Sequence, residues 1–400
     1  MFVAVGRGRK DAKALSHALK IETMSLGGGR RADEIELPEL HDRIPVFFFG
    51  REEIEMMRRL EERIRENYPI YQIALIGKKR VRNARMEELR DSFEISKAKI
   101  RLGMRFNEVF EFSVKNEMNL EIHPDFDSYF LIGERSVERI GRVFGIEVEE
   151  GALILRALMN EERIYVPRLK AIISKRIGSE PSVIYENSEI KAERIELGEM
   201  IERNKKFLEA LERISLRFIR ENAEGAVGVP FSGGKDSLAA LILSKRALGD
   251  VRAIYIRTNY DFPKTEEYVE EVCRKLGVEL ITGEVSFDVS THGLPTHQNR
   301  WCTAMKLEAL KKVVDEEGIE TLVVGDRDGE SRVRRKRDFV ERRVSREIFP
   351  IKHWSGAMVQ LYVMMRGFEL HPMYLEGLYR IGCTICPSLS KWEKIVLQEV

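Results

Sequence analysis

The chain has little of what marks a disulfide-stapled, membrane-spanning or strongly basic protein. It has 4 cysteines in 400 residues, too few for a disulfide framework in a chain of this size. Lys and Arg total 67 and Asp and Glu 66, so nucleic-acid or membrane binding would need a local patch of charge. Apolar runs such as 45–49 and 238–243 are too short to cross a bilayer. The N-terminus lacks signal-peptide order, and we expect a cytoplasmic protein without membrane contact.

The length of 400 residues predicts two or three domains. We expect a small α/β module at 1–80, a mixed α+β module at 81–190 and a larger domain at 191–400, entered by a helix at 195–220. In the larger domain, strands at 226–230, 252–257, 279–281 and 321–324 alternate with helices at 238–248, 265–276 and 306–317. This alternation predicts a doubly wound, mostly parallel sheet with ligands at the carboxyl ends of its strands.

The most informative segment is Phe-Ser-Gly-Gly-Lys-Asp-Ser at 231–237, between an expected strand and an expected helix. Glycines let the backbone approach an anion, and the first helical turn offers free N–H groups to phosphate oxygens. We therefore expect nucleotide phosphates to be bound by the six residues Ser232, Gly233, Gly234, Lys235, Asp236 and Ser237. Asp236 is expected to contact Mg²⁺ or to cap the helix. A Walker A loop does not fit, because Asp236 follows the lysine.

Four further blocks follow in the C-terminal half. They are Thr-Asn-Tyr-Asp-Phe-Pro-Lys-Thr at 258–265, Arg-Trp-Cys-Thr at 300–303 with Lys306, Gly-Asp-Arg-Asp-Gly-Glu-Ser at 325–331 with Arg334, and Pro-Ile-Lys-His-Trp at 350–354 with a segment at 371–386 that ends in Gly-Cys-Thr-Ile-Cys. Each falls where a loop over the predicted sheet is expected. Arginines in such loops suit bidentate recognition of phosphate or sulfate.

Together the five blocks resemble the phosphoadenosine phosphosulfate (PAPS) reductase-like family of the ATP pyrophosphatase (PP-loop) superfamily, as an archaeal-type member with an extra N-terminal region. The resemblance covers about 191–400 and implies an adenine nucleotide α-hydrolase-like fold. It implies that Lys235, Asp236, Arg300 and Arg327 are catalytic and that Thr258 and Arg334 bind the nucleotide. The ligand is expected to be ATP with Mg²⁺, or a sulfonucleotide (APS or PAPS). Lys264 stands where the family has an acidic residue.

Three of the cysteines fall in these blocks: Cys302, Cys383 and Cys386. The iron–sulfur branch of the family has a fourth ligand where this chain has Trp301. Three thiolates can hold a [4Fe-4S] cluster with one open iron, as in ATP-dependent tRNA thiolases of the superfamily. Zinc with an added histidine, and a metal-free site, are the alternatives. Cys273 is expected to be core.

Basic residues are dense from Arg327 to Arg346. This run predicts either contact with a polyanion such as RNA or a solvated face balanced by nearby carboxylates.

The leading interpretation is an enzyme that adenylates an acceptor with ATP, releases pyrophosphate and transfers sulfur, with RNA thiolation as one form. An APS or PAPS reductase is the alternative enzyme. No Glu-Cys-Gly-x-His segment, the reductase nucleophile motif, follows Cys386 in these 400 residues. A nucleotide- or RNA-binding protein without turnover is the third possibility. The sequence does not identify the acceptor, the sulfur or electron donor, or the oligomeric state.

Overall fold

The computed structural model describes residues 1–29, 34, 36–37, 39–157, 161–166, 169–174, 182–185, 195–389 and 391–398. The chain forms two compact units, one of residues 1–124 with 203–217 and one of 125–202 with 218–400. These units do not coincide with the modules expected at 1–80, 81–190 and 191–400, whose boundaries stay a prediction. Among the described residues, no helix is long and apolar enough to cross a membrane.

The first unit is built on a four-stranded parallel sheet of order β2-β1-β3-β4. Its strands are β1 (Phe2–Gly6), β2 (Glu22–Ser25), β3 (Ile44–Gly50) and β4 (Gln72–Ile76), with helices α1 (Arg9–Leu19), α2 (Ile54–Asn67) and α3 (Met86–Leu102) and a hairpin of β5 (Met104–Asn107) and β6 (Val109–Phe112). All seven residues of β3 are buried, as a continuous apolar run in a parallel sheet predicts. Residues 2–76 thus contain a parallel α/β sheet, and the module boundary expected at residue 80 stays a prediction.

The long helix α5 (Leu197–Asn222) begins two residues later and ends two residues later than expected. Its residues 203–217 belong to the first unit. There the side chain of Asn204 forms hydrogen bonds with the backbone of β6, as a neighbouring strand would. It accepts from Phe112 N at 2.7 Å and donates to Phe110 O at 2.9 Å. This buried amide satisfies backbone groups that would otherwise be unpaired.

The second unit begins with a five-stranded antiparallel sheet of order β11-β10-β9-β8-β7. It comprises β7 (Asp127–Phe130), β8 (Leu153–Arg156), β9 (Glu161–Val166), β10 (Leu169–Ser174) and β11 (Ser182–Tyr185), with α4 (Glu134–Phe144) after β7. The edge strand β7 packs against the later helix α11 (Gly356–Met365). The side-chain amide of Gln360 on that helix accepts from Phe130 N and donates to Phe130 O at 2.8 and 3.0 Å. This sheet is therefore joined to the C-terminal domain.

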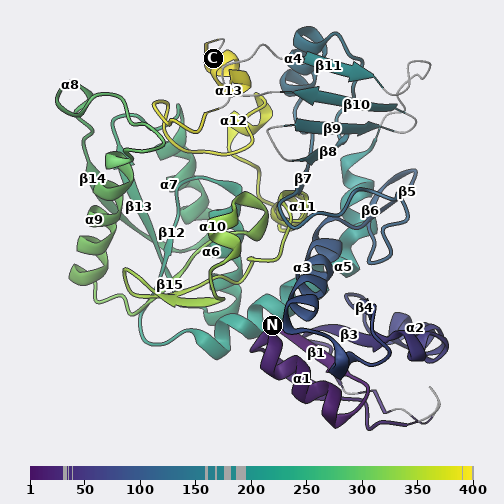
Figure 1. Cartoon of the computed structure of the whole chain (residues 1–400). Helices are drawn as coiled ribbons and strands as arrows, with labels where there is room; N and C mark the ends of the chain where they lie inside the picture. The colour runs from purple at the N-terminus through teal and green to yellow at the C-terminus, as the bar shows by residue number, and fades with distance from the viewer. Residues whose placement is uncertain are drawn as a thin grey trace. The chain divides into compact units, whose positions relative to one another are not determined.

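The predicted doubly wound sheet is present in the C-terminal half, with strand order β14-β13-β12-β15-β17-β16 (Figure 1). Its strands are β12 (Val227–Pro230), β13 (Arg252–Thr258), β14 (Glu279–Val285), β15 (Thr321–Val323), β16 (Val340–Arg342) and β17 (Arg346–Ile348). All pairs are parallel except β16 with β17. The order reverses between β12 and β15, and ligands of such sheets bind at that switch point.

Eight helices accompany this sheet in the part of the chain that the structure describes. They are α6 (Lys235–Leu248), α7 (Thr265–Leu276), α8 (Val289–His292), α9 (Trp301–Glu316), α10 (Arg332–Arg335), α11, α12 (Pro372–Leu375) and α13 (Lys391–Gln398). The start expected for α6 at 238 was wrong by three residues, because Gly234 ends the loop and Lys235 already has helical hydrogen bonding. Likewise α9 begins at Trp301 and not at Lys306. Both corrections place predicted site residues within a first helical turn.

Candidate functional site

The 231–237 segment forms a tight loop between β12 and α6 at the switch point. Gly233 has φ +76°, and a Cβ there would lie 3.3 Å from His371 Cδ2, so the position requires glycine. The N–H of Lys235 donates to Tyr374 Oη at 3.0 Å. In the part of the chain that the structure describes, five backbone N–H groups of this turn have no hydrogen-bond partner, those of Ser232, Gly233, Gly234, Asp236 and Ser237. Free N–H groups at a helix start are suited to phosphate oxygens.

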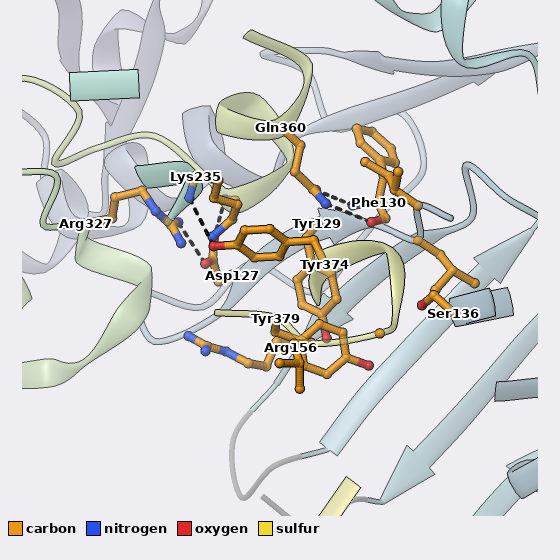
Figure 2. A pocket seen from close by; sticks show the side chains of 15 residues that line it. Asp127, Tyr129, Phe130, Ser136, Arg156, Lys235, Arg327, Gln360, Tyr374 and Tyr379 are labelled. Carbon is orange, nitrogen blue, oxygen red and sulfur yellow. Dashed lines mark hydrogen bonds and ion pairs between the residues drawn. The ribbon is translucent and has the colours of Figure 1, made fainter. Parts of the chain in front are cut away.

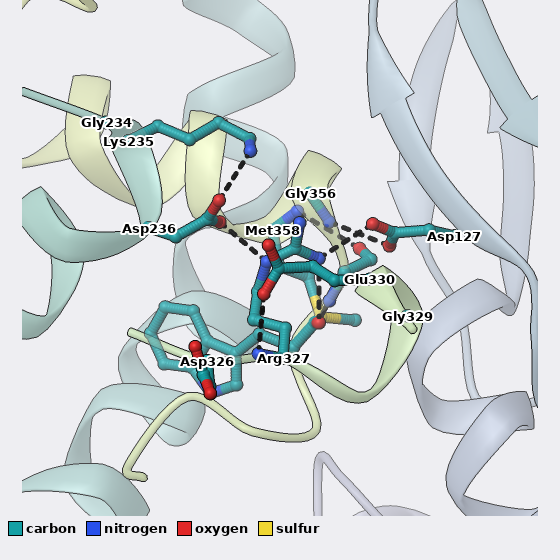
Figure 3. A network of polar contacts seen from close by, with 12 residues as sticks. Asp127, Gly234, Lys235, Asp236, Asp326, Arg327, Gly329, Glu330, Gly356 and Met358 are labelled. Atoms are coloured by element: carbon teal, nitrogen blue, oxygen red, sulfur yellow. Dashed lines mark hydrogen bonds and ion pairs between the residues drawn. The ribbon is translucent and has the colours of Figure 1, made fainter. Parts of the chain in front are cut away.

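Four charged side chains form an alternating chain behind the loop (Figure 3). Lys235 Nζ contacts Asp236 Oδ2 at 2.8 Å. Asp236 Oδ1 accepts from Arg327 Nε at 2.6 Å, and Arg327 Nη1 donates to Asp127 Oδ2 at 2.8 Å. The side chains of Lys235, Arg327 and Asp127 are 3–4% exposed and that of Asp236 is 17% exposed. Two positive and two negative charges thus neutralise each other in a nearly dry site.

The carboxyl group of Asp236 stays ionised despite its burial. Burial alone would raise its pKa, but the charges of Arg327 and Lys235 outweigh this effect and lower the pKa to about 2. Burial likewise opposes the charge on Arg327, while Asp127, Asp236 and Glu330 raise the pKa of its guanidinium. At neutral pH the site therefore holds an ionised carboxylate that is partly exposed, the type of ligand that Mg²⁺ takes.

Asp127 was not predicted from the sequence. It lies at the start of β7, about 100 residues before the loop. Its Oδ1 accepts from Gly356 N at 3.1 Å and from Ser128 N at 3.0 Å. Gly329 packs against the same carboxylate so closely that a Cβ there would lie 2.8 Å from Asp127 Cγ. A single aspartate at a strand end gives no sequence signal that would have identified it.

The loop after β15 closes onto the start of α6. A Cβ on Gly325 would lie 2.6 Å from the backbone carbonyl carbon of Asp236. No side chain fits there, because the nearest atoms belong to backbone. The glycine of the 325–331 block therefore brings Arg327 within reach of Asp236.

A small cavity of about 40 Å³ lies beside Lys235 (Figure 2). Its walls include Asp127, Arg156, Arg327 and Tyr374. A cavity of this size holds only water-sized ligands. It therefore lies at the back of the loop and is not the space for a nucleotide.

The three predicted cysteines line one cavity of about 210 Å³. Its other walls are three cations, two aromatic rings and several small or aliphatic residues, among them Arg300, Lys306, Arg380, Phe262, Phe287, Ile381, Ile385 and Leu389. Lys306 Nζ lies 3.1 Å from Cys383 Sγ and 3.6 Å from Asp261 Oδ1. Burial raises the pKa of the Cys383 thiol, and Lys306 offsets part of that rise.

The cavity tests the cofactor predictions only in part. Among the described residues, no three His, Cys, Asp or Glu side chains are arranged to hold a single metal ion. Cys302, Cys383 and Cys386 line the same cavity, and the thiolates of a polynuclear cluster bind different iron atoms, so this finding leaves the cluster as a prediction. Cys273 is buried in α7, as expected, and burial raises the pKa of its thiol to about 11.

The other predicted site residues lie either near the 231–237 loop or at the cysteine cavity. Thr258 ends β13 and donates to Asp261 Oδ1 at 2.7 Å, with its hydroxyl 3.9 Å from Cys383 Sγ. Arg300 lines the cysteine cavity and not the cavity beside Lys235. Arg334 pairs with Asp326 at 3.2 Å and also with Glu330. The structure thus groups Lys235, Asp236 and Arg327 at the loop, and Arg300 with the cysteines.

The loop and the cysteine cavity are joined by one turn. Phe262 is a wall of the cavity, and its carbonyl accepts from the Thr265 hydroxyl at 2.8 Å. A Cβ on Gly233 would lie 3.4 Å from Thr265 Cγ2. The two predicted parts of the site are therefore neighbours across residues 262–265.

The basic run from Arg327 to Arg346 is largely paired within the chain. Arg332 and Arg335 contact Asp125, Arg334 and Arg337 contact Asp326, and Arg343 contacts Glu347. These pairs favour the solvated, counter-charged face over the polyanion site. The RNA interpretation therefore stays a proposal.

His371 lies beside Gly233 of the loop and makes the stability of the protein depend on pH. It is fully buried, its Nδ1 accepts from Met373 N at 3.2 Å, and its Nε2 therefore carries the proton and donates to Thr265 Oγ1 at 3.1 Å. Burial lowers its pKa to about 4, below the ~6.5 of an unfolded histidine. The unfolded chain binds more protons between these values, so stability falls as the pH drops from about 6.5 to about 4. We expect a loss of up to roughly 3 kcal/mol of unfolding free energy.

Urea unfolding at several pH values measures this effect. The substitution His371→Gln should flatten the pH dependence over that range, whereas His17→Gln, at an exposed position, should leave it unchanged. Equal slopes for the wild type and His371→Gln would contradict the prediction.

Comparisons with known proteins agree with this geometry. Residues 226–389 match the family description "Phosphoadenosine phosphosulfate reductase domain". An uncharacterized protein of Methanocaldococcus jannaschii is 34% identical over 250 residues, 59% of this chain and 51% of that protein. A phosphoadenosine 5'-phosphosulfate reductase of Vibrio vulnificus is 25% identical over 204 residues, 48% of this chain and 77% of the reductase. The chain thus spans about half the length of its Methanocaldococcus relative.

Among solved structures, the U34-tRNA thiolase of Methanococcus maripaludis, with its [4Fe-4S] cluster, is 18% identical. The similarity covers 48% of this chain and 72% of the thiolase, with a TM-score of 0.33. The sequence match and the doubly wound sheet show that residues 226–389 form a PAPS reductase-like domain. This is the domain expected from the five blocks.

Proposed function

We propose that this protein is an adenine-nucleotide enzyme of sulfur metabolism that adenylates an acceptor with ATP and releases pyrophosphate. The observation that carries the proposal is the 232–237 loop, where five backbone N–H groups without a hydrogen-bond partner among the described residues lie in one turn with the buried side chain of Lys235. Such a site is suited to the β- and γ-phosphates of ATP. The family match supports the nucleotide class.

In the proposed reaction, the loop residues orient the nucleotide and stabilise charge on the leaving pyrophosphate. Lys235 would exchange its contact with Asp236 for a phosphate oxygen, which frees the Asp236 carboxylate. Mg²⁺, which fits this ionised and partly exposed carboxylate, would supply further charge neutralisation on the phosphates. Arg327 would act through Asp236, because both carboxylates beside it already take its Nε and Nη1 donors.

The cysteine cavity supports sulfur transfer as the second half of the reaction. Cys302, Cys383 and Cys386 would hold a [4Fe-4S] cluster, whereas zinc would require these side chains to rearrange. Either group would bind a sulfur species as a Lewis acid. The three cations on its walls, Arg300, Lys306 and Arg380, suit an anionic acceptor such as RNA. The sulfur donor and the acceptor stay open.

Two alternatives remain. An APS or PAPS reductase would use the same loop for a sulfonucleotide, and the relative from Vibrio vulnificus has that activity in its name. A nucleotide-binding protein without turnover would keep the loop and bind the same ligands.

Anaerobic calorimetric titration with ATP–Mg²⁺, APS and PAPS separates these possibilities. The proposal predicts tight binding of ATP–Mg²⁺, weak binding of both sulfonucleotides and pyrophosphate release that depends on an added acceptor. Preference for APS or PAPS with sulfite release would establish the reductase. Binding of nucleotide without either product would leave the non-catalytic protein. Iron, acid-labile sulfide and zinc are assayed in the same anaerobic preparation.

A further inference from the structure

Asp127 lies outside residues 226–389, the part of the chain that matches the reductase domain. It is nevertheless one of the four charges of the loop. Its carboxylate is 3% exposed and uses both oxygens, one for Arg327 and one for the N–H groups of Ser128 and Gly356. Backbone donors and the close packing of Gly329 fix its position. Asp127 is therefore a rigid anion at a set place beside Arg327.

Arg327 is held between two carboxylates. Its Nε donates to Asp236, its Nη1 to Asp127 and, at 3.4 Å, to Trp354 O, and its backbone N–H donates to Glu330. The side chain is 3% exposed. A buried guanidinium with these contacts holds the two carboxylates at a fixed separation. This role differs from the direct contact with the nucleotide that was expected from the sequence.

The balance of charge among these four side chains affects the binding of a cation. When Asp127 is present, its carboxylate balances the charge of Arg327 at Nη1. Asp236, which contacts Nε of the same arginine, then retains negative charge that a cation can use. Without Asp127, Arg327 would lose one of its two carboxylate partners, and more of its positive charge would act on the remaining one, Asp236. A buried charge at that range acts through a low effective dielectric and is weakly screened by salt.

We propose that Asp127 is a positioning residue of the nucleotide site: it holds and neutralises Arg327, so that the Asp236 carboxylate stays available to the divalent cation of a bound nucleotide. The antiparallel sheet that begins with β7 is on this view part of the nucleotide site. The inference rests on the proposed function, because it presumes that a nucleotide and Mg²⁺ bind at the 232–237 loop.

The test is ATP binding to the full-length protein as a function of Mg²⁺ concentration, followed by calorimetry, and ATP binding in EDTA. For Asp127→Asn we expect the Mg²⁺ concentration at half-maximal binding to rise about tenfold. Binding of ATP in EDTA should be equal or tighter, because the site has gained positive charge. A purely structural role would weaken both. The matched control is Glu347→Gln, which removes another buried carboxylate, paired with Arg343 at 2.8 Å on β17. Glu347→Gln should change neither the Mg²⁺ concentration at half-maximal binding nor ATP binding in EDTA.

The double variant Asp127→Asn/Arg327→Met keeps the inference testable if the single variant Asp127→Asn does not fold. It removes one charge of each sign, so the net charge of the site is unchanged. The proposal predicts that its Mg²⁺ midpoint returns to within about threefold of the wild type. An unchanged midpoint in Asp127→Asn, or a double variant that binds no better than the single one, would overturn the inference alone. A wild type whose ATP binding does not depend on Mg²⁺ would overturn the proposed function as well.

Discussion

Replacing Lys235 by alanine is expected to weaken ATP–Mg²⁺ binding about 10- to 100-fold and to reduce product formation further. Lys235 is the one cation of the 231–237 loop, and its ammonium is 4% exposed. A hydrogen bond to a charged group contributes about 1.5–3 kcal/mol. An added contribution to turnover follows if the lysine stabilises the leaving pyrophosphate. Calorimetric titration gives the binding constant, and a pyrophosphate assay gives the rate.

Lys245 provides the matched control, because it lies on the same helix and its ammonium contacts Gly277 O at the surface. Lys245→Ala should bind ATP–Mg²⁺ as the wild type does. Lys235→Ala also leaves Asp236 with one partner, so circular dichroism and urea unfolding are needed to show that the variant is folded. A folded Lys235→Ala protein with wild-type affinity would show that nucleotide does not bind at this loop.

Replacing Arg327 by methionine is expected to cost about 3–5 kcal/mol of unfolding free energy at neutral pH. The substitution leaves Asp127 and Asp236 facing each other without the guanidinium between them, and both are largely buried. Removing one partner of a buried pair is expensive, because the remaining charge stays in a poorly solvating environment. Urea unfolding at pH 7 measures the loss.

Two comparisons make this prediction specific. Arg332→Met removes an arginine whose side chain is 69% exposed and which also pairs with a carboxylate, Asp125. We expect it to cost less than about 1 kcal/mol. The double variant Asp127→Asn/Arg327→Met should recover part of the loss, because the carboxylate charge that lost its guanidinium is also removed. A cost below about 1 kcal/mol for Arg327→Met would mean that the buried chain of charges contributes little to stability.

The phosphate loop and the sheet that carries it could be predicted from the sequence because their signals are local. An apolar strand, two glycines and a helix within about 25 residues identify the loop. The Cys-x-x-Cys at 383–386 and the cysteine at 302 predicted a shared location, and the cavity confirms it. The boundaries of α6 and α9 were wrong because both helices begin before the apolar pattern does, and neither start has a side-chain cap hydrogen bond that the sequence could have indicated.

The rest of the site could not be predicted because its signals are long-range. Asp127 is an unremarkable strand-end residue until Arg327 and Gly356 are placed beside it. The arginines from Arg332 to Arg343 left two alternatives open, a polyanion site or a counter-charged face. The carboxylates that pair with them lie partly in distant segments, such as Asp125, and could not be identified from the sequence. Charge in a sequence does not show which ions are already paired in the fold.

The contact between Asp127 and Arg327 joins residues 200 positions apart. A ribosome releases Asp127 long before Arg327 and Gly356, so this carboxylate reaches both partners only after most of the chain has been made. Closing a segment of this length costs chain entropy before the contact offsets it. Residues far apart in the sequence thus have to come together before the four charges beside the 231–237 loop are complete.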